Sequence, residues 1–447
     1  MKNMPLEDIL NQALKAGADS ADILLAHSVS LSAGVRLGKT ESLERSESFN
    51  LGLRVFKGKK QAIVSSNDIS DAAIKTTVER AVAMAGHIPE DEYCGIAPEE
   101  LYAQNWQHDA EQLELEDRVA TVGPERLLEL ALEAEDAALS VDGIENSEGA
   151  SAGWGPEHYT YVTSNGFRGS YARTGAGLSV SVLAGTGTEM ERDYAYHSAC
   201  HFDDLESPQE IGKRAAERTL KRLHPQKIAT AQMPVVYDPR VSNSLLRHLS
   251  GAINGSSIAR GTSFLKNDMG KRIFAEGITV TDDPRICRGI RSQVFDDEGV
   301  SSEELLLIED GVLQSWVLDL RTARKLKLET GGRASRDVSS PPSPAVTNLF
   351  MGAGKVTPQE LIGDIKRGIY VTELIGSGVN MVTGDYSRGA FGYMIENGEI
   401  THPVTEITVA GNLRDMWLNL TPANDLRHRY GIDAPTLRID GMTVAGN

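Results

Sequence analysis

The stretch YTYVTSNGFRGSYART, residues 159–174, indicates an antiparallel β-hairpin near the middle of the chain. Aromatic and β-branched residues alternate with polar ones on both sides of Asn165-Gly166. Asn-Gly between two alternating segments is the strongest short hairpin signal, because a type I′ turn needs two residues that tolerate positive φ. The stretch from Gly175 to His201 is also strand-like. We therefore expect an extended antiparallel β region here.

The segments around this hairpin alternate between helix and strand signals. Apolar residues at helical spacing over 6–14 predict a first helix, and a second is expected after Ser70. Residues 51–66 hold two apolar runs broken by Lys-Gly-Lys-Lys, which is a hairpin signal. A third helix is predicted over 124–139. Ser207-Pro208-Gln209-Glu210 then has the cap, the proline and the acidic residue of a helix start.

The second half begins with a strand at 234–237 and a predicted helix from Pro239 to Ile258. Thr357 to Glu360 repeats the capping pattern, and short strand-like runs follow to the end of the chain. We expect an α+β fold, with an N-terminal α/β region that has antiparallel strands and a C-terminal β-rich domain. The expected domains are 1–228, which can divide into 1–105 and 106–228, and 229–447.

Composition narrows the classes of partner. The 447 residues carry a net charge of −18, and nucleic acids and anionic membranes are bound through excess Lys and Arg. We therefore expect neither as a partner. The N-terminus lacks the apolar stretch of a signal peptide, and no window of about 20 apolar residues exists. Three scattered cysteines, Cys94, Cys200 and Cys287, fit reduced thiols, so we expect a cytoplasmic protein.

Two familiar catalytic motifs are missing from the sequence. It contains no complete G-x-x-x-x-G-K-[ST] phosphate-binding loop and no H-E-x-x-H. The segment YHSACHFDD places His197 and His201 four apart with Cys200 between them, followed by Asp203 and Asp204. On a helix this spacing could seat a metal, but the segment continues a strand, where residues four apart lie about 13 Å apart. We interpret these histidines as structural or exposed.

Six ordered blocks resemble the TldD/PmbA family, and specifically its PmbA (TldE) branch. They are LLRHLSGAINGSSIARGTSFL (245–265), GITVTDDP (277–284), the run from Phe295 through GVLQSWVLDLRTARKL (to 326), PPSPAVTNL (341–349), NMVTGDYSRGAFGYMIENGEI (380–400) and PTLRIDGMTVAG (435–446). The resemblance implies a two-subunit metallopeptidase. In that family the TldD-type subunit holds zinc through H-E-x-x-x-H on a helix and a C-terminal cysteine, and the glutamate activates the bound water.

This chain departs from that pattern at every ligand. An ungapped alignment back from Gly261-Thr262-Ser263 places Leu246 and Gly251 at the two histidines and Arg247 at the glutamate. His248 stands alone on its helix, and one imidazole cannot hold a catalytic zinc. The C-terminal cysteine loop is also missing, since the last cysteine is Cys287. The resemblance therefore implies a chain with no catalytic residues, no metal ligands and no cofactor, whose TldD-type partner carries the zinc.

The resemblance also implies that the two subunits together enclose a chamber around the partner's zinc, and it suggests which polar groups of this chain line that chamber. The candidates are Ser256, Ser257, Arg260, Asp385, Ser387 and Arg388. An alternative for Arg388 is a structural ion pair with Asp385. The expected partners are a TldD-type subunit in a heterodimer, a second copy of this chain when it is alone, and a peptide substrate. Two other functions stay open, a binding or scaffold protein without peptidase role and an autonomous peptidase with an unrecognised site.

Overall fold

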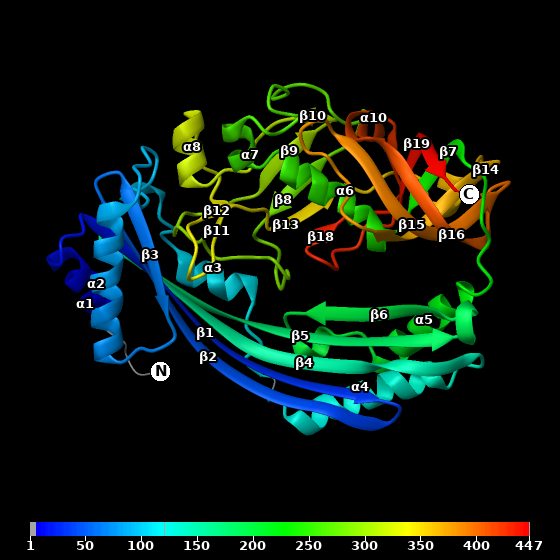
Figure 1. Cartoon of the computed structure of the whole chain (residues 1–447), viewed down its shortest axis with the longest axis horizontal. Coiled ribbons are helices and arrows are strands. Elements are labelled where there is room, and N and C mark those ends of the chain that lie inside the picture. Colours follow the sequence, from blue (N-terminus) through cyan, green and yellow to red (C-terminus); the bar gives the residue numbers. More distant parts are fainter. Residues whose placement is uncertain (1–5, 120, 447) are drawn as a thin grey trace.

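A computed structural model of the chain describes residues 6–119 and 121–446 and has the predicted α+β architecture. A long, curved sheet lies below the C-terminal domain in Figure 1. Its six strands are antiparallel and hydrogen-bonded in the order β3-β2-β1-β4-β5-β6. They are β1 (Ser20–Arg36), β2 (Lys39–Lys57), β3 (Lys60–Ser66), β4 (Ile144–Thr163), β5 (Arg168–Ala184) and β6 (Glu191–Ala199).

The hairpin at Asn165-Gly166 joins β4 to β5 as predicted. The two strands pair from Val162 opposite Arg168 to Ile144 opposite Ala184. Gly166 has φ +104°, a conformation that glycine adopts without strain. The hydroxyl of Tyr102 donates to Oδ1 of Asn165 at 2.8 Å, which ties the turn to the segment before α3 (Trp106–Leu113).

Four helices cover one face of this sheet, namely α1 (Leu6–Lys15), α2 (Asp71–His87), α4 (Pro124–Leu139) and α5 (Pro208–Lys221). The period of two along β1 explains the layering, because alternate side chains point to opposite faces. Ile23 packs in the apolar cluster of α1 and α2, and Ala33 and Val35 pack with α4. Leu24 faces the other way, into a cluster with Phe295 of the C-terminal half.

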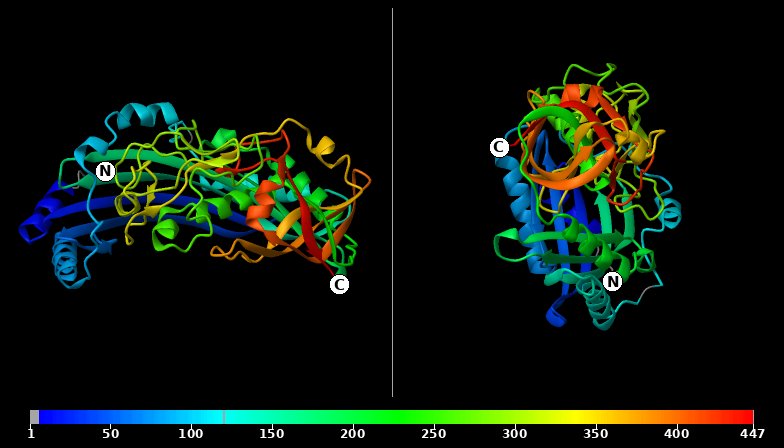
Figure 2. Two further views of the ribbon diagram at one scale, coloured as in Figure 1. Left: turned by 90° about the horizontal axis from the view of Figure 1, so that it is seen from above. Right: turned by 90° about the vertical axis from the view of Figure 1, so that its right-hand side faces the viewer.

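The C-terminal domain is built on a small closed barrel. Its ring consists of β7 (Ala231–Tyr237), β14 (Arg367–Ile375), β15 (Asp385–Glu396), β16 (Glu399–Asn412) and β19 (Leu437–Ala445). The β7–β14 pair is parallel and the others are antiparallel, and the β16–β19 pairing closes the ring. The right-hand view in Figure 2 looks along this barrel.

A second sheet packs beside the barrel in the order β10-β9-β8-β13-β18. Its strands are β8 (Val280–Asp283), β9 (Leu305–Glu309), β10 (Val312–Leu313), β13 (Asn348–Met351) and β18 (Ile432–Asp433). The remaining elements are short: α8 (Leu320–Leu326), α9 (Pro358–Ile362), α10 (Leu413–Leu418), β11 (Ala334–Ser335), β12 (Ser343–Pro344), β17 (Leu420–Pro422) and 3₁₀ turns at Glu99–Leu101, Gly187–Glu189 and Phe202–Asp204. No helix in the described parts of the chain is long and apolar enough to cross a membrane.

The single helix predicted from Pro239 to Ile258 is wrong, because the structure has two helices here. They are α6 (Pro239–Ala252) and α7 (Gly255–Arg260). Asn254 takes an extended conformation, and its side-chain oxygen accepts the backbone N–H of Ser256 at 2.9 Å. Asparagine competes for backbone donors in this way, so it ends one helix and caps the next.

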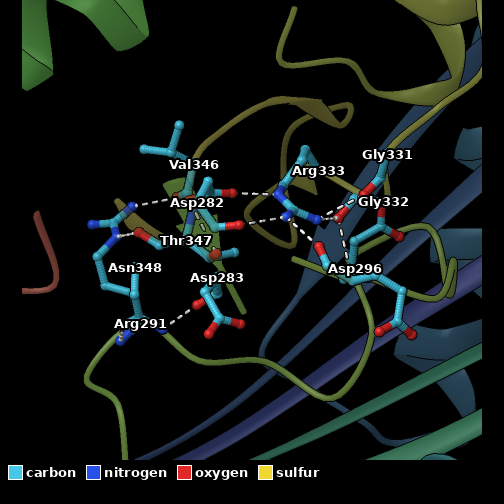
Figure 3. A network of polar contacts seen from close by, with 12 residues as sticks. Asp282, Asp283, Arg291, Asp296, Gly331, Gly332, Arg333, Val346, Thr347 and Asn348 are labelled. Atoms are coloured by element: carbon cyan, nitrogen blue, oxygen red, sulfur yellow. Dashed lines mark hydrogen bonds and ion pairs between the residues drawn. The ribbon is translucent and has the colours of Figure 1, made fainter. Parts of the chain in front are cut away.

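One fully buried arginine connects several loops of the C-terminal domain (Figure 3). The guanidinium of Arg333 forms an ion pair with Asp282 of β8, and both side chains are 0 % exposed. Its Nη1 donates to the carbonyls of Gly331 and Gly332 at 2.7 and 3.3 Å. Its Nη2 donates to the carbonyls of Asp282 and Glu303 at 3.0 and 2.6 Å. All five donors of the guanidinium are therefore used.

Candidate functional site

Helix α6 holds Leu246, Arg247 and Gly251, the positions at which the sequence resemblance placed the zinc ligands and the general base of a TldD-type subunit. Asp238 caps it by accepting the backbone N–H of Arg240 at 2.9 Å, and Pro239 takes the first helical position. The helix packs between β14 of the barrel and β13 and β18 of the second sheet. Its buried residues are Val241, Ser242, Asn243, Leu245, Leu246, Leu249 and Ala252.

The residues at the two expected ligand positions and at the expected general-base position do not fit a metal site. Leu246 is 0 % exposed and belongs to the apolar core of the C-terminal domain. Arg247 is exposed. A Cβ built at Gly251 would lie 3.1 Å from the terminal methyl of Met381, so a larger side chain there requires Met381 to move. An apolar side chain, a cation and a glycine offer no lone pair to zinc.

His248, two residues beyond the first ligand position, is the imidazole on α6. Its ring lies 5.9 Å from the ring of Tyr386 on β15, in an edge-on arrangement of 74°. Burial and the nearby Arg388 cation lower the pKa of His248 to about 4. The Nε2 atom is buried and has no hydrogen-bond partner in the described structure. The imidazole is thus held neutral near pH 7 inside the protein, where it packs as a ring.

The candidate lining residues of α7 lie near α8 and β12, which α7 contacts. Ser256 and Ser257 are half-buried, and Arg260 is exposed. Arg260 has no hydrogen-bond or ion-pair partner within the described ranges, so its guanidinium is available to a ligand or a partner chain.

The three candidates on β15 divide between the two faces of the strand. Asp385 and Ser387 are exposed on one face, whereas Arg388 is half-buried on the face that carries Tyr386. Asp385 accepts hydrogen bonds from Thr383 and from Asn412, at 2.6 and 3.1 Å, and these donors lower the pKa of Asp385.

The alternative ion pair between Arg388 and Asp385 is not formed. Arg388 instead directs Nη2 towards the carbonyl of Leu374 at 3.4 Å, and its buried Nε has no partner in the described residues. The α7 and β15 candidates also share no hydrogen bond or ion pair with each other within residues 6–119 and 121–446. The segment after α7 is connected to the loop before β15 by one backbone hydrogen bond. In it, the N–H of Phe264 donates to the carbonyl of Met381 at 2.9 Å.

The His197–His201 segment does not converge on a metal. Nδ1 of His197 accepts the backbone N–H of Glu206 at 3.1 Å, and the ring of His201 bonds the carbonyl of Glu114 at 2.7 Å. Cys200 points its thiol towards the carbonyl of Gly289. Across the described residues, no group of three or more His, Cys, Asp or Glu side chains is placed to hold a metal ion.

Sequence reasoning missed a pair of buried acids between the sheet and the C-terminal domain. Asp296 is 0 % exposed and accepts backbone N–H groups from Glu298, Val300 and Ala334 at 2.9, 2.9 and 3.0 Å. Glu298 is 2 % exposed and accepts the N–H of Leu320 at 2.9 Å. Burial raises the pKa of Asp296 to about 7, and burial together with Asp296 raises that of Glu298 to about 8.

These raised values predict that the protein loses stability as the pH rises from about 6.5 to 8.5. The folded state keeps protons on Asp296 and Glu298 that the unfolded chain has already released near pH 4.5, so folding binds protons in this window. Each such proton lowers the free energy of unfolding by about 1.4 kcal/mol per pH unit below its folded-state pKa, and the slope flattens above about pH 8, where both groups have lost their protons. Urea unfolding followed at successive pH values measures the slope.

Glu298→Gln is the matched control, because glutamine keeps the shape of the side chain and does not titrate. The variant is expected to flatten the slope above pH 6.5, where the unfolded-state histidines have already lost their protons. Stability that rises with pH in the wild-type chain between pH 6.5 and 8.5 would contradict the assignment.

Comparison with known proteins places this architecture in a family. The family models of the PmbA/TldA metallopeptidase match domain 1 at residues 21–85, the central domain at 117–223 and the C-terminal domain at 230–446. The chain belongs to the PmbA/TldA metallopeptidase family, as its ordered motifs indicated.

Relatives support this assignment over the whole chain. Metalloprotease PmbA of Escherichia coli O157:H7 is 37% identical and aligns with 99% of this chain and 96% of its own. The metalloprotease PmbA homolog of Haemophilus influenzae is 37% identical, with coverages of 97% and 94%. Two crystal structures share the fold. One is a candidate DNA gyrase modulator from Bacteroides thetaiotaomicron (28% identity, TM-score 0.90, coverages 99% and 98%). The other is TldE from Thermococcus kodakarensis (21% identity, TM-score 0.86, coverages 99% and 100%).

Proposed function

We propose that this chain is the non-catalytic subunit of a TldD/PmbA-type metallopeptidase complex that acts on peptides and unfolded polypeptides in the cytoplasm. The observation that carries the proposal is the chemistry of α6. In the proposed alignment, Leu246 and Gly251 stand at the two histidine ligands and Arg247 stands at the general base. Leu246 is fully buried in the apolar core of the C-terminal domain. Peptide hydrolysis then belongs to a TldD-type partner that holds zinc, and this chain contributes part of the chamber wall.

The relatives are consistent with two kinds of subunit in one organism. Haemophilus influenzae has the PmbA homolog that is 37% identical to this chain over nearly its full length. The same organism has a metalloprotease TldD homolog that is 28% identical over 254 residues, which is 53% of this chain. The chain therefore resembles one of two coexisting relatives much more closely, as expected if the two have different roles. Without its partner, we expect this chain to form a homodimer through the same face.

A free strand edge offers one route for holding a peptide. Strand β2 pairs with β1 along its length, but β3 covers only its last part, from Leu51 to Lys57. The longer first part, 39–50, therefore has backbone N–H and C=O groups without a neighbouring strand on one side. Its charged side chains, among them Lys39, Glu41 and Glu44, discourage indiscriminate pairing with other strands. An extended peptide could add to such an edge through backbone hydrogen bonds.

Zinc content of the purified chain tests the non-catalytic assignment. We expect well below one zinc per chain after mild chelation, because the ligand positions supply no donor atoms. Elemental analysis measures the ratio. A value near one zinc per chain would contradict the proposal, and an associated peptidase activity of this chain alone would favour the autonomous enzyme instead.

Arg260→Ala tests the lining role. The side chain is exposed and has no partner within the described residues, so the variant should fold with unchanged stability. If Arg260 binds peptide carbonyls or carboxylates, its loss removes a charge-assisted hydrogen bond and lowers kcat/KM of the paired complex by on the order of tenfold.

Arg80→Ala on α2 is the matched control, since Arg80 is equally exposed and has no partner in the described structure. Arg388→Ala serves as a second variant, with a loss of stability expected because Arg388 is half-buried in the barrel. Unchanged activity of the complex with Arg260→Ala, alongside normal folding, would show that the lining assignment is wrong.

A further inference from the structure

A cavity of about 340 Å³ lies between the central sheet and the C-terminal domain, away from the positions discussed above. Arginines dominate its lining, with Arg214 and Arg218 from α5, Arg240 from α6, and Arg427 and Arg429 from the segment before β18. The cavity lies at the N-terminal end of α6, which is about 18 Å along the helix from Gly251 at 1.5 Å per residue. It is therefore separate from the former zinc position.

The carboxylates in this cavity have other partners. Asp238 caps α6 and accepts the hydroxyl of Tyr370 at 2.9 Å. Asp425 accepts both the N–H and the hydroxyl of Thr436, at 2.9 and 2.7 Å. The third lining carboxylate, that of Asp433, accepts a backbone N–H. The lining holds five arginines and three aspartates, and two further carboxylates just outside it, those of Asp193 and Glu206, pair with three of the arginines.

Two of the five guanidiniums have no carboxylate partner. Arg240 is paired in two-point geometry with Asp193, and Arg214 and Arg429 share Glu206. Arg218 is half-buried, and its guanidinium donates a 3.2 Å hydrogen bond to the carbonyl of Tyr194. Arg427 is exposed and has no partner among the described residues.

The environment of Arg218 disfavours its positive charge. Burial and the neighbouring Arg240 cation lower the pKa of Arg218. A half-buried cation without a counter-ion is costly, and a bound anion would relieve that cost. The positive end of the α6 dipole acts in the same direction, because Asp238 and Pro239 at its start also line the cavity.

Aromatic rings form one wall of the cavity. Tyr194 and Tyr196 stack with ring centroids 6.1 Å apart, and Tyr196 lies 5.7 Å from Tyr430. Tyr194 and Tyr196 stay 40% and 39% exposed, and the guanidinium of Arg240 lies 4.8 Å from the centroid of the Tyr194 ring, so the exposed edges of the rings face the cavity. Rings presented beside free guanidiniums suit a ligand that has both a planar ring and a negative group.

We propose that this cavity binds a small oxyanion attached to a planar ring, with Arg218 and Arg427 binding the oxyanion and Tyr194 and Tyr196 contacting the ring. The oxyanion is either a phosphate ester or the terminal carboxylate of a peptide that ends in an aromatic residue. The inference concerns this chain alone and does not depend on its pairing with a peptidase subunit.

Isothermal titration of the full chain tests the site with three probes: phenyl phosphate, an acetylated dipeptide ending in phenylalanine, and the amide of that dipeptide. We expect one site per chain for at least one of the two anions, with binding weakened by salt. Binding of phenyl phosphate alone identifies a phosphate ester, and binding of the acidic dipeptide alone identifies a peptide terminus. Failure of both anions to bind at millimolar concentration overturns the proposal, as does equal binding of the amide.

Variants locate the site. Arg427→Gln and Arg218→Gln are each expected to weaken binding of the anion at least tenfold. Arg427 is exposed, so Arg427→Gln should fold normally even if Arg218→Gln does not. Arg80→Gln, on an exposed part of α2, is the matched control and should bind as the wild type does. Unchanged affinity in Arg427→Gln and Arg218→Gln, with both variants folded, would place any binding elsewhere.

Discussion

Arg333→Met is expected to lower the free energy of unfolding of the C-terminal domain by about 3–5 kcal/mol, the range found when one partner of a buried ion pair is removed. The Arg333 side chain is 0 % exposed and forms its ion pair with Asp282. Methionine can fill part of the space, but it leaves the Asp282 carboxylate buried without its cation. It also removes the donors for the carbonyls of Gly331 and Glu303, which Arg333 contacts at 2.7 and 2.6 Å.

Only part of the Asp282 hydrogen bonding survives in this variant. Thr347 still donates its backbone N–H and its hydroxyl to Oδ1, at 2.7 and 3.1 Å. Neutral donors do not replace a cation in a buried site, so the domain should unfold at much lower urea concentration. Tryptophan fluorescence follows the unfolding, and the buried Trp417 is one of the two tryptophans of this domain among the four of the chain.

Arg272→Met is the matched control, since Arg272 forms an ion pair with Asp310 in the same domain but is 41% exposed. Surface pairs contribute about 0–1 kcal/mol, so this variant should unfold close to the wild type. A change of less than 1 kcal/mol for Arg333→Met would show that the buried network is not what holds these loops together.

Local signals in the sequence predicted most of the individual elements. The Asn165-Gly166 turn, the helix after Ser70, the cap at Ser207 and the capping box at Thr357 all form. Each of these depends on residues within a few positions of one another, so a single sequence contains the information. The break at Asn254 was missed because an apolar helical pattern continues on both sides of it.

The pairing of strands that lie far apart in the sequence could not be predicted from such local signals. Closure of the barrel depends on Thr408–Ala410 pairing with Thr443–Ala445, and on the parallel pairing of β7 with β14. No local pattern specifies such partners. From the block GDYSRG we expected Asp385, Ser387 and Arg388 to line the same surface. In the structure, the alternation of β15 places Asp385 and Arg388 on opposite faces of the strand. The arginine cavity brings together Arg214 and Arg429, which no periodicity connects.

This chain is expected to show no peptidase activity until it is combined with a TldD-type chain. In this chain, α6 offers no ligand set, since Leu246 is in the core and Gly251 has no side chain. In the partner, the two histidines of H-E-x-x-x-H and a cysteine are expected to bind zinc, and the glutamate is expected to act as the general base. The effect should be close to all or none, because a zinc-activated water and its base together supply several kcal/mol of transition-state stabilisation.

Cleavage of an unfolded, fluorescently labelled polypeptide by the mixed chains therefore tests the central claim most directly. The account predicts no activity for this chain alone, activity in the equimolar mixture above that of the partner alone, and complete loss when the partner's motif glutamate is changed to glutamine. Cleavage by this chain alone, or by the mixture with the glutamine variant, would contradict the assignment of this chain as the non-catalytic subunit.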